Sequence, residues 1–93
     1  MKFEIATTNR FEKDVKIAKK RGLDLEKLFA AVEIIADDKL QLPAKYQDHN
    51  LIGDFVGCRE CHIEPDWLLV YKKEETIKLV TLTRTGTHSD LFG

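Results

Sequence analysis

The spacing of hydrophobic residues changes partway along this chain, and that change restricts the folds it can adopt. Between residues 9 and 36, apolar side chains recur every three or four positions, as on the buried face of an α-helix. Between residues 51 and 84, they fall in short runs separated by glycine, proline and charged turns, as in β-strands. The sequence therefore predicts an α+β fold, with helices and strands segregated along the chain.

A more detailed assignment places one strand before the helices, because polar and apolar residues alternate over residues 2–7. Helices are expected at residues 9–21, with Asn9 and Glu12 as a capping box, and at 24–36. Their short connection predicts an antiparallel helical hairpin. The remaining strands are expected at residues 51–56, 59–63, 67–72 and 77–84. The predicted order is β-α-α-β-β-β-β, a small, mostly antiparallel sheet with two N-terminal helices packed on one face.

Length and composition fit one small domain that spans residues 1–93. The longest apolar runs are only a few residues, so no membrane-spanning segment is expected. The N-terminal residues include several acidic side chains and no hydrophobic leader segment. The expected location is therefore the cytoplasm.

The string Cys58-x-x-Cys61-His62 matches the attachment pattern of c-type haem. A regular strand, however, points Cys58 and Cys61 to opposite faces, because side chains alternate with period two. A haem or zinc site needs converging sulfur atoms, and the chain has no second pair of this kind. We therefore expect no metal and no cofactor, and we expect Cys61 to be a small core residue.

The three histidines all lie in the second half of the chain, near predicted strand ends or loops. An aspartate and an arginine with similar positions complete a candidate set: His49, His62, Asp66, Arg84 and His88. Histidine exchanges protons near neutral pH, arginine binds phosphate, and an exposed Trp67 would stack on a base. Together they predict metal-free phosphodiester cleavage. One group would take a proton from the ribose 2′-OH, and another would protonate the leaving 5′ oxygen.

The first predicted helix is basic, with a row of lysines that could contact phosphate groups. They are Lys13, Lys16, Lys19 and Lys20. The simpler interpretation of such a row is a solvated helix face.

Three separated motifs resemble one protein family in order and spacing. They are LPAxYxDHxLxG at residues 42–53, GxRxxHxEPDWxLxY at 57–71 and RTGTHxxLF at 84–92. They are similar to the YafQ toxins, within the RelE/ParE superfamily of type II toxin–antitoxin systems. The resemblance covers nearly the whole chain, and Cys58 and Cys61 are departures from the family pattern.

The resemblance implies an mRNA endonuclease that acts on the translating ribosome and is neutralised by a cognate antitoxin. Operator DNA would be bound only through that antitoxin. The active site would consist of His49, His62, Asp66, Trp67, Arg84, His88 and Phe92. We expect His88 to be the general acid and Arg84 to stabilise the transition state, with Trp67 and Phe92 holding the nucleotide or shaping the site. The general base stays open among His62, Asp66 and His49.

Ribosomal RNA would be the partner of the basic helix in that interpretation. Two alternatives remain. A ParE-like toxin would inhibit DNA gyrase by binding, without chemistry. A degenerate toxin would act only as a co-repressor with its antitoxin.

Overall fold

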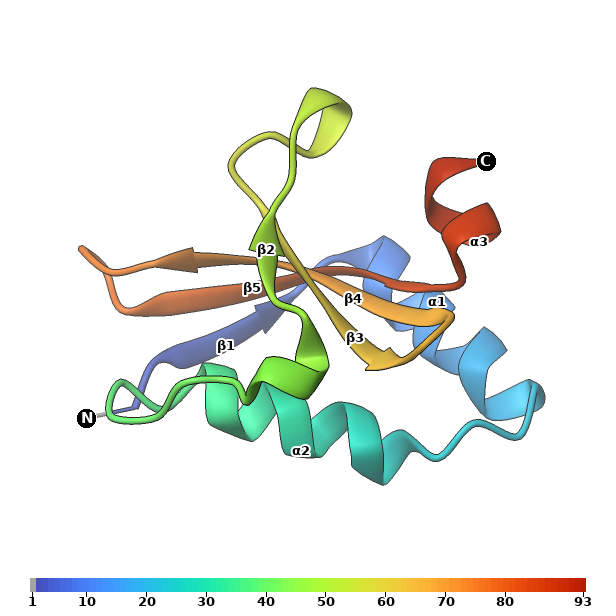
Figure 1. Ribbon diagram of the computed structural model, residues 1–93, viewed down its shortest axis with the longest axis horizontal. Coiled ribbons are helices and arrows are strands. Elements are labelled where there is room, and N and C mark those ends of the chain that lie inside the picture. Colours follow the sequence, from blue (N-terminus) through green and yellow to red (C-terminus); the bar gives the residue numbers. More distant parts are fainter. Residues whose placement is uncertain (1) are drawn as a thin grey trace.

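The computed structural model describes residues 2–93, which form one five-stranded sheet and three α-helices. The first half contains β1 (Glu4–Thr7), α1 (Asn9–Lys20) and α2 (Leu25–Ile35). The remaining elements are the short 3₁₀ helix η1 (Ala44–Tyr46), β2 (His49–Asn50), the 3₁₀ helix η2 (Gly53–Phe55), β3 (Arg59–Glu64), β4 (Trp67–Glu74), β5 (Leu79–Gly86) and α3 (His88–Phe92). Figure 1 shows this arrangement. Across residues 2–93, no helix is long and apolar enough to cross a membrane.

The strands are ordered β1-β5-β4-β3-β2, and only the β1–β5 pair is parallel. The predicted α+β class, the order of the first two helices and the five strands, and the mostly antiparallel sheet are therefore confirmed, whereas α3 was not predicted. The parallel pairing of the first and last strands requires a crossover, and α1 and α2 lie on that path (Figure 1). The first strand of the chain therefore lies beside the last strand in the sheet.

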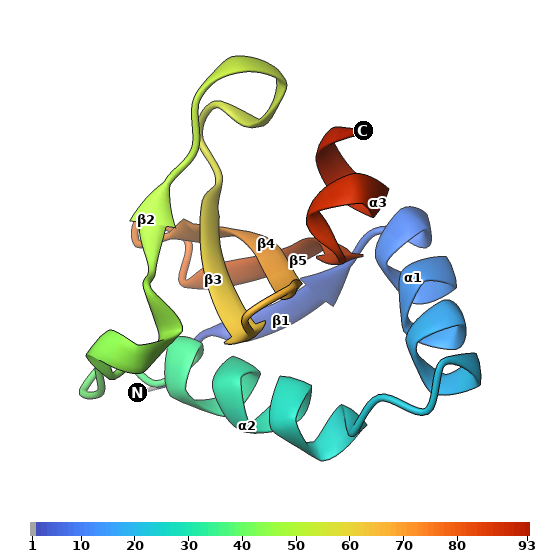
Figure 2. The ribbon, with the colours of Figure 1, turned by 45° about the vertical axis from the view of Figure 1, so that its right-hand side comes forward.

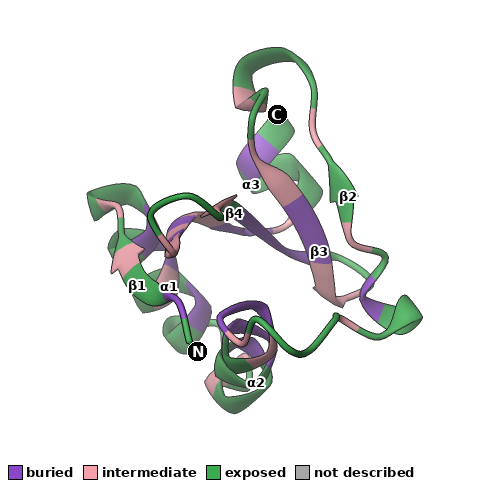
Figure 3. Cartoon of the chain, turned by 90° about the vertical axis from the view of Figure 1, so that its left-hand side faces the viewer, coloured by how far each residue is buried: buried purple, intermediate pink, exposed green. Residues whose placement is uncertain are grey.

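Both long helices bury their apolar stripes against one face of the sheet, as predicted. The core joins Phe11 and Ala18 of α1 to Leu28 and Val32 of α2, and these pack with Leu69 and other strand residues. Figure 3 shows buried segments along β3, β4 and the side of α2 that faces the sheet. The opposite face carries a smaller cluster, in which Leu91 of α3 packs with Leu68 and Val70. Much of that face stays open beside α3.

Three local predictions are wrong. Thr8, and not Asn9, caps α1, because its side chain accepts a hydrogen bond from the Phe11 amide at 3.0 Å. The two helices do not form an antiparallel hairpin: Figure 2 shows α2 leading away from α1 beneath the sheet. Residues 51–56 are not a strand either. That segment is a protruding loop with η2, bounded by Gly53 and Gly57 with positive φ values of 72° and 91°.

The two cysteines occupy opposite sides of the sheet, as their spacing predicts. Cys61 is fully buried in the main core, and burial raises the pKa of its thiol to about 12. Cys58 is half-buried beside the second cluster. The sulfur atoms therefore do not converge on a common ligand.

This separation predicts different thiol reactivities. At neutral pH, we expect a thiol-reactive disulfide reagent to modify Cys58 rapidly in the folded protein and Cys61 only after denaturation in urea, because Cys61 is buried and protonated. A time course with Cys58→Ser as the control measures this directly. Rapid modification of the Cys58→Ser variant under native conditions would show that the Cys61 thiol is not buried as described.

Candidate active site

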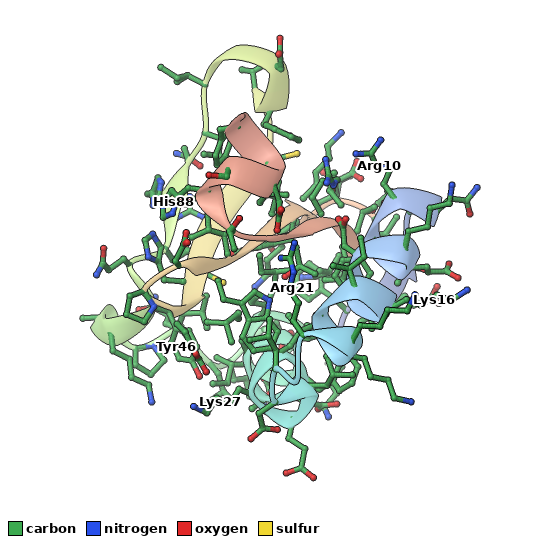
Figure 4. All side chains as sticks on the ribbon, turned by 90° about the vertical axis from the view of Figure 1, so that its right-hand side faces the viewer. Arg10, Lys16, Arg21, Lys27, Tyr46 and His88 are labelled. Carbon is green, nitrogen blue, oxygen red and sulfur yellow. The ribbon has the colours of Figure 1, made fainter. Side chains whose placement is uncertain are left out.

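The three histidines converge on the open face of the sheet. His62 lies on β3, and β2 pairs His49 with Glu60 of the same strand. His88 begins α3 and projects toward the same group (Figure 4). The His62 ring centroid lies 6.3 Å from that of His49 and 5.8 Å from that of His88. A phosphate group placed between two rings at this spacing would have a possible acid on one side and a possible base on the other.

Asp66 fixes His88 through two hydrogen bonds. One carboxylate oxygen accepts the backbone N–H of His88 at 2.9 Å and its Nδ1–H at 2.6 Å. These bonds lower the pKa of Asp66, so the carboxylate stays ionised. Because an ionised carboxylate only accepts, Nδ1 carries the hydrogen and Nε2 of His88 is left for a substrate. Asp66 therefore orients the ring and is a weak candidate for the general base.

Glu60 is a member of the cluster that the sequence-based set omitted. Its side chain is almost fully buried, and the residue is 4% exposed. Its Oε1 atom lies 3.4 Å from Nε2 of His49 and 3.6 Å from Nε2 of His62. A buried carboxylate beside two imidazoles stabilises positive charge on either ring. The available signal was its position two residues before His62, which places both on one strand face.

The same atoms form a potential metal-binding group. Glu60, His62 and His88 each offer one ligand atom, and these atoms all lie within 4.8 Å of one another. The remaining histidine is held separately, because Nδ1–H of His49 donates to the carbonyl oxygen of Gln47 at 2.7 Å. That bond directs Nε2 of His49 toward Glu60.

Arg84 is not brought into contact with the histidines. Its Nε and Nη2 atoms donate to the Asp14 carboxylate of α1 at 2.7 and 3.2 Å. The side chains of this pair are 15% and 8% exposed. Arg84 pairs with Val70, which in turn pairs with Glu60, so the arginine shares their sheet face from two strands away. Within residues 2–93, no hydrogen bond or ion pair links Arg84 to a histidine.

The two aromatic candidates differ in exposure. Trp67 was expected to be exposed, and that expectation is wrong: it is 2% exposed within the main core. Its indole N–H donates to Oγ1 of Thr85 at 2.9 Å, so its ring has no free face for a base. Phe92 is 49% exposed and makes an edge-to-face contact with Phe55, with centroids 5.6 Å apart. Only Phe92 is available to a nucleotide.

The basic residues of α1 lie on a different part of the surface. Lys13, Lys16, Lys19 and Lys20 are all exposed. Figure 4 shows Lys16 pointing outward on the side away from His88. These lysines therefore form a charged surface separate from the histidine cluster.

Comparison with known proteins gives consistent matches along the whole chain. A family model described as "Bacterial toxin of type II toxin-antitoxin system, YafQ" matches residues 3–93. The mRNA interferase toxin YafQ of Escherichia coli K12 is 46% identical over 90 residues, covering 97% of this chain and 96% of that protein.

Solved structures agree with these sequence matches. A chain from the crystal structure of the E. coli DinJ-YafQ toxin-antitoxin complex has a TM-score of 0.90 and 43% identity, with all of both chains covered. A metal-bound toxin from Helicobacter pylori has a TM-score of 0.89 and 42% identity, covering 97% of this chain and 99% of that one.

Proposed function

Since the chain belongs to the YafQ family of bacterial toxins from type II toxin–antitoxin systems, we propose that it is an mRNA interferase that cuts RNA with its histidine cluster. One observation carries the proposal: three histidines meet on an open face, and carboxylates contact each of them. Imidazole groups at this spacing suit paired general acid and base catalysis.

In the proposed reaction, His62 takes the proton of a ribose 2′-OH. The 2′ oxygen then bonds to the adjacent phosphorus, and the bond between phosphorus and the 5′ oxygen breaks. His88 gives a proton to that leaving oxygen, which yields a cyclic phosphate and a 5′-hydroxyl. Glu60 stabilises the positive charge that His62 gains, and Asp66 holds the ring of His88. Asp66 is set aside as base because its lowered pKa makes that carboxylate the weaker proton acceptor. His62 is preferred to His49 because its ring lies beside that of His88, with centroids 5.8 Å apart.

The proposed partners are a translating ribosome with its mRNA and a cognate antitoxin. Lys13, Lys16, Lys19 and Lys20 offer positive surface for ribosomal RNA phosphates. The antitoxin is supported by the E. coli relative, whose structure was solved as a complex with DinJ. A metal ion held by Glu60, His62 and His88 would occupy the atoms that transfer protons, so the protein should be treated with a chelator, and the chelator removed, before it is added to the ribosomes.

Primer extension on an mRNA in a reconstituted translation system tests the proposal. Discrete cuts that need both the protein and translating ribosomes are expected. Intact mRNA, together with inhibition of gyrase supercoiling, would instead favour the ParE-like alternative. Intact mRNA without gyrase inhibition would leave the co-repressor alternative.

Replacing Asp66 with asparagine should lower the single-turnover cleavage rate by about 10- to 100-fold, because the amide holds the His88 ring less well. Because the pKa of Asp66 is lowered in the folded protein, its carboxylate is ionised at any pH above the unfolded-state pKa of about 4. Its contact with His88 is lost only as the pH falls through the lower, folded-state pKa. Protonation of Asp66 itself therefore contributes nothing to the effect at neutral pH, where its carboxylate is ionised. An Asp66→Asn protein that cuts at the wild-type rate at neutral pH would contradict this role.

A further inference from the structure

A cavity opens directly beside the histidine cluster, at the end of β3. Its volume is about 570 Å³, within the range of about 300–1,000 Å³ for small-molecule sites. We call it the β3-edge pocket. It lies between α2, η1 and the end of β3, and its lining includes Ala30, Lys45, Tyr46, His62, Ile63 and Pro65. In Figure 4, Tyr46 and Lys27 lie together below His88. His62 is thus shared by the pocket and the proposed active site.

Among residues 2–93, no strand pairs with the outer side of β3 beyond Glu60, where β3 borders this pocket. β2 pairs with β3 only at Arg59 and Glu60. The rest of β3, residues 61–64, is paired with β4 on its other side. An unpaired strand edge presents backbone N–H and C=O groups in a row. These groups supply hydrogen bonds of the kind that a nucleobase edge requires.

Charge and apolar surface in the pocket also fit a nucleotide. Ile63, Pro65 and Ala30 provide apolar contact for a base. Lys27 is neutralised by Glu64 at 3.1 Å, whereas Lys45 has no carboxylate partner among residues 2–93. Lys45 lies over the Tyr46 ring, with Nζ 5.3 Å from its centroid. Within the part of the chain that the structure describes, the pocket therefore combines apolar side chains with one lysine that has no carboxylate partner.

We propose that the β3-edge pocket binds the ribonucleotide on the 5′ side of the cut, the one whose 2′-OH is the nucleophile. This inference depends on the proposed function, in which His62 takes the proton of that hydroxyl. His62 lines the pocket, whereas His88 does not. His88 begins α3, the helix that ends with the exposed Phe92. The nucleotide on the 3′ side of the cut, which carries the leaving oxygen, accordingly lies against Phe92.

The assignment predicts different binding sites for two classes of probe. Nucleoside 3′-monophosphates resemble the 5′-side product, and nucleoside 5′-monophosphates resemble the 3′-side nucleotide. We expect the 3′-monophosphates to shift the NMR amide signals of Lys45, Gln47 and Ile63, and the 5′-monophosphates to shift those of α3. Lys45→Glu should weaken 3′-monophosphate binding about tenfold, through loss of a charge-assisted phosphate contact. Its binding of 5′-monophosphates should be unchanged.

Lys39→Glu is the matched control, because Lys39 is exposed on the loop after α2 and does not line the pocket. It makes the same change in net charge. A second variant, Ala30→Phe, fills the pocket from an exposed helix position and should also weaken 3′-monophosphate binding. The amide spectra of all three variants establish that they are folded.

Three outcomes would overturn the inference: 3′-monophosphates that shift only α3, equal effects of Lys45→Glu and Lys39→Glu, or no shifts in the pocket at millimolar probe. The mRNA cleavage assay is performed on the same wild-type preparation. Cleavage without pocket binding rejects the pocket alone. Absence of cleavage rejects the proposed function, whatever the probes bind.

Discussion

Alanine in place of His88 is expected to lower the rate of mRNA cleavage by about 10²–10⁴-fold, the contribution of a positioned general acid. The 2′-OH can still lose its proton to His62 in this variant, but the leaving 5′ oxygen must depart without a proton. His88 is exposed at the start of α3, so its removal should leave the core intact. Single-turnover cleavage on programmed ribosomes measures the effect, and amide spectra of the free protein establish that the fold is unchanged.

The matched control is Ser89→Ala, an exposed change at the next position of α3. It should cleave at the wild-type rate. Ribosome binding should be the same for the wild type and both variants, because the expected defect lies in chemistry. A His88→Ala protein that cuts mRNA at the wild-type rate would remove His88 from the mechanism. If His88→Ala instead arrested growth without cutting mRNA, a gyrase-type toxin would become the better interpretation.

Much of the histidine cluster could be predicted from strand periodicity. Alternation over β3 placed His62 opposite Cys61, and the structure has Cys61 in the core and His62 on the open face. Periodicity says nothing about register between strands, however. Glu60 joins the cluster because β2 pairs His49 with it, and that pairing is a tertiary property. A sequence with His62 and Glu60 two residues apart shows only that they share a face.

The errors have similarly local causes. The strand predicted from Trp67 onward is present, but its first five residues are all buried, so Trp67 is not exposed as expected. Aromatic residues with a polar tip are commonly buried when that tip finds a partner, and here Thr85 supplies it. α3 was missed although Thr87 and Asp90 form a capping box, because a helix of five residues is too short for a hydrophobic period.

Alanine in place of Asp14 should lower the free energy of unfolding by about 3–5 kcal/mol, the usual cost of breaking one side of a buried ion pair. The substitution leaves the Arg84 guanidinium without its partner in a largely buried position. It also removes the acceptor for the Thr85 amide, which donates to Asp14 at 3.1 Å. The Asp14 carboxylate therefore makes the main polar contacts between α1 and β5. Urea unfolding followed by circular dichroism measures the change.

Arg21→Ala provides the contrasting surface pair, because Arg21 and Asp90 meet at 2.6 Å but are much more exposed than Asp14 and Arg84. Solvent screens such a pair, so its loss should change stability far less. Similar losses in both variants would show that burial does not distinguish the two pairs.

Arg84→Gln tests the arginine of the buried pair, with stability and mRNA cleavage measured on the same protein. If Arg84→Gln loses stability but cuts mRNA at the wild-type rate when folded, the arginine anchors α1. If the cleavage rate of Arg84→Gln decreases by more than its fraction of folded protein, Arg84 also acts on the phosphate.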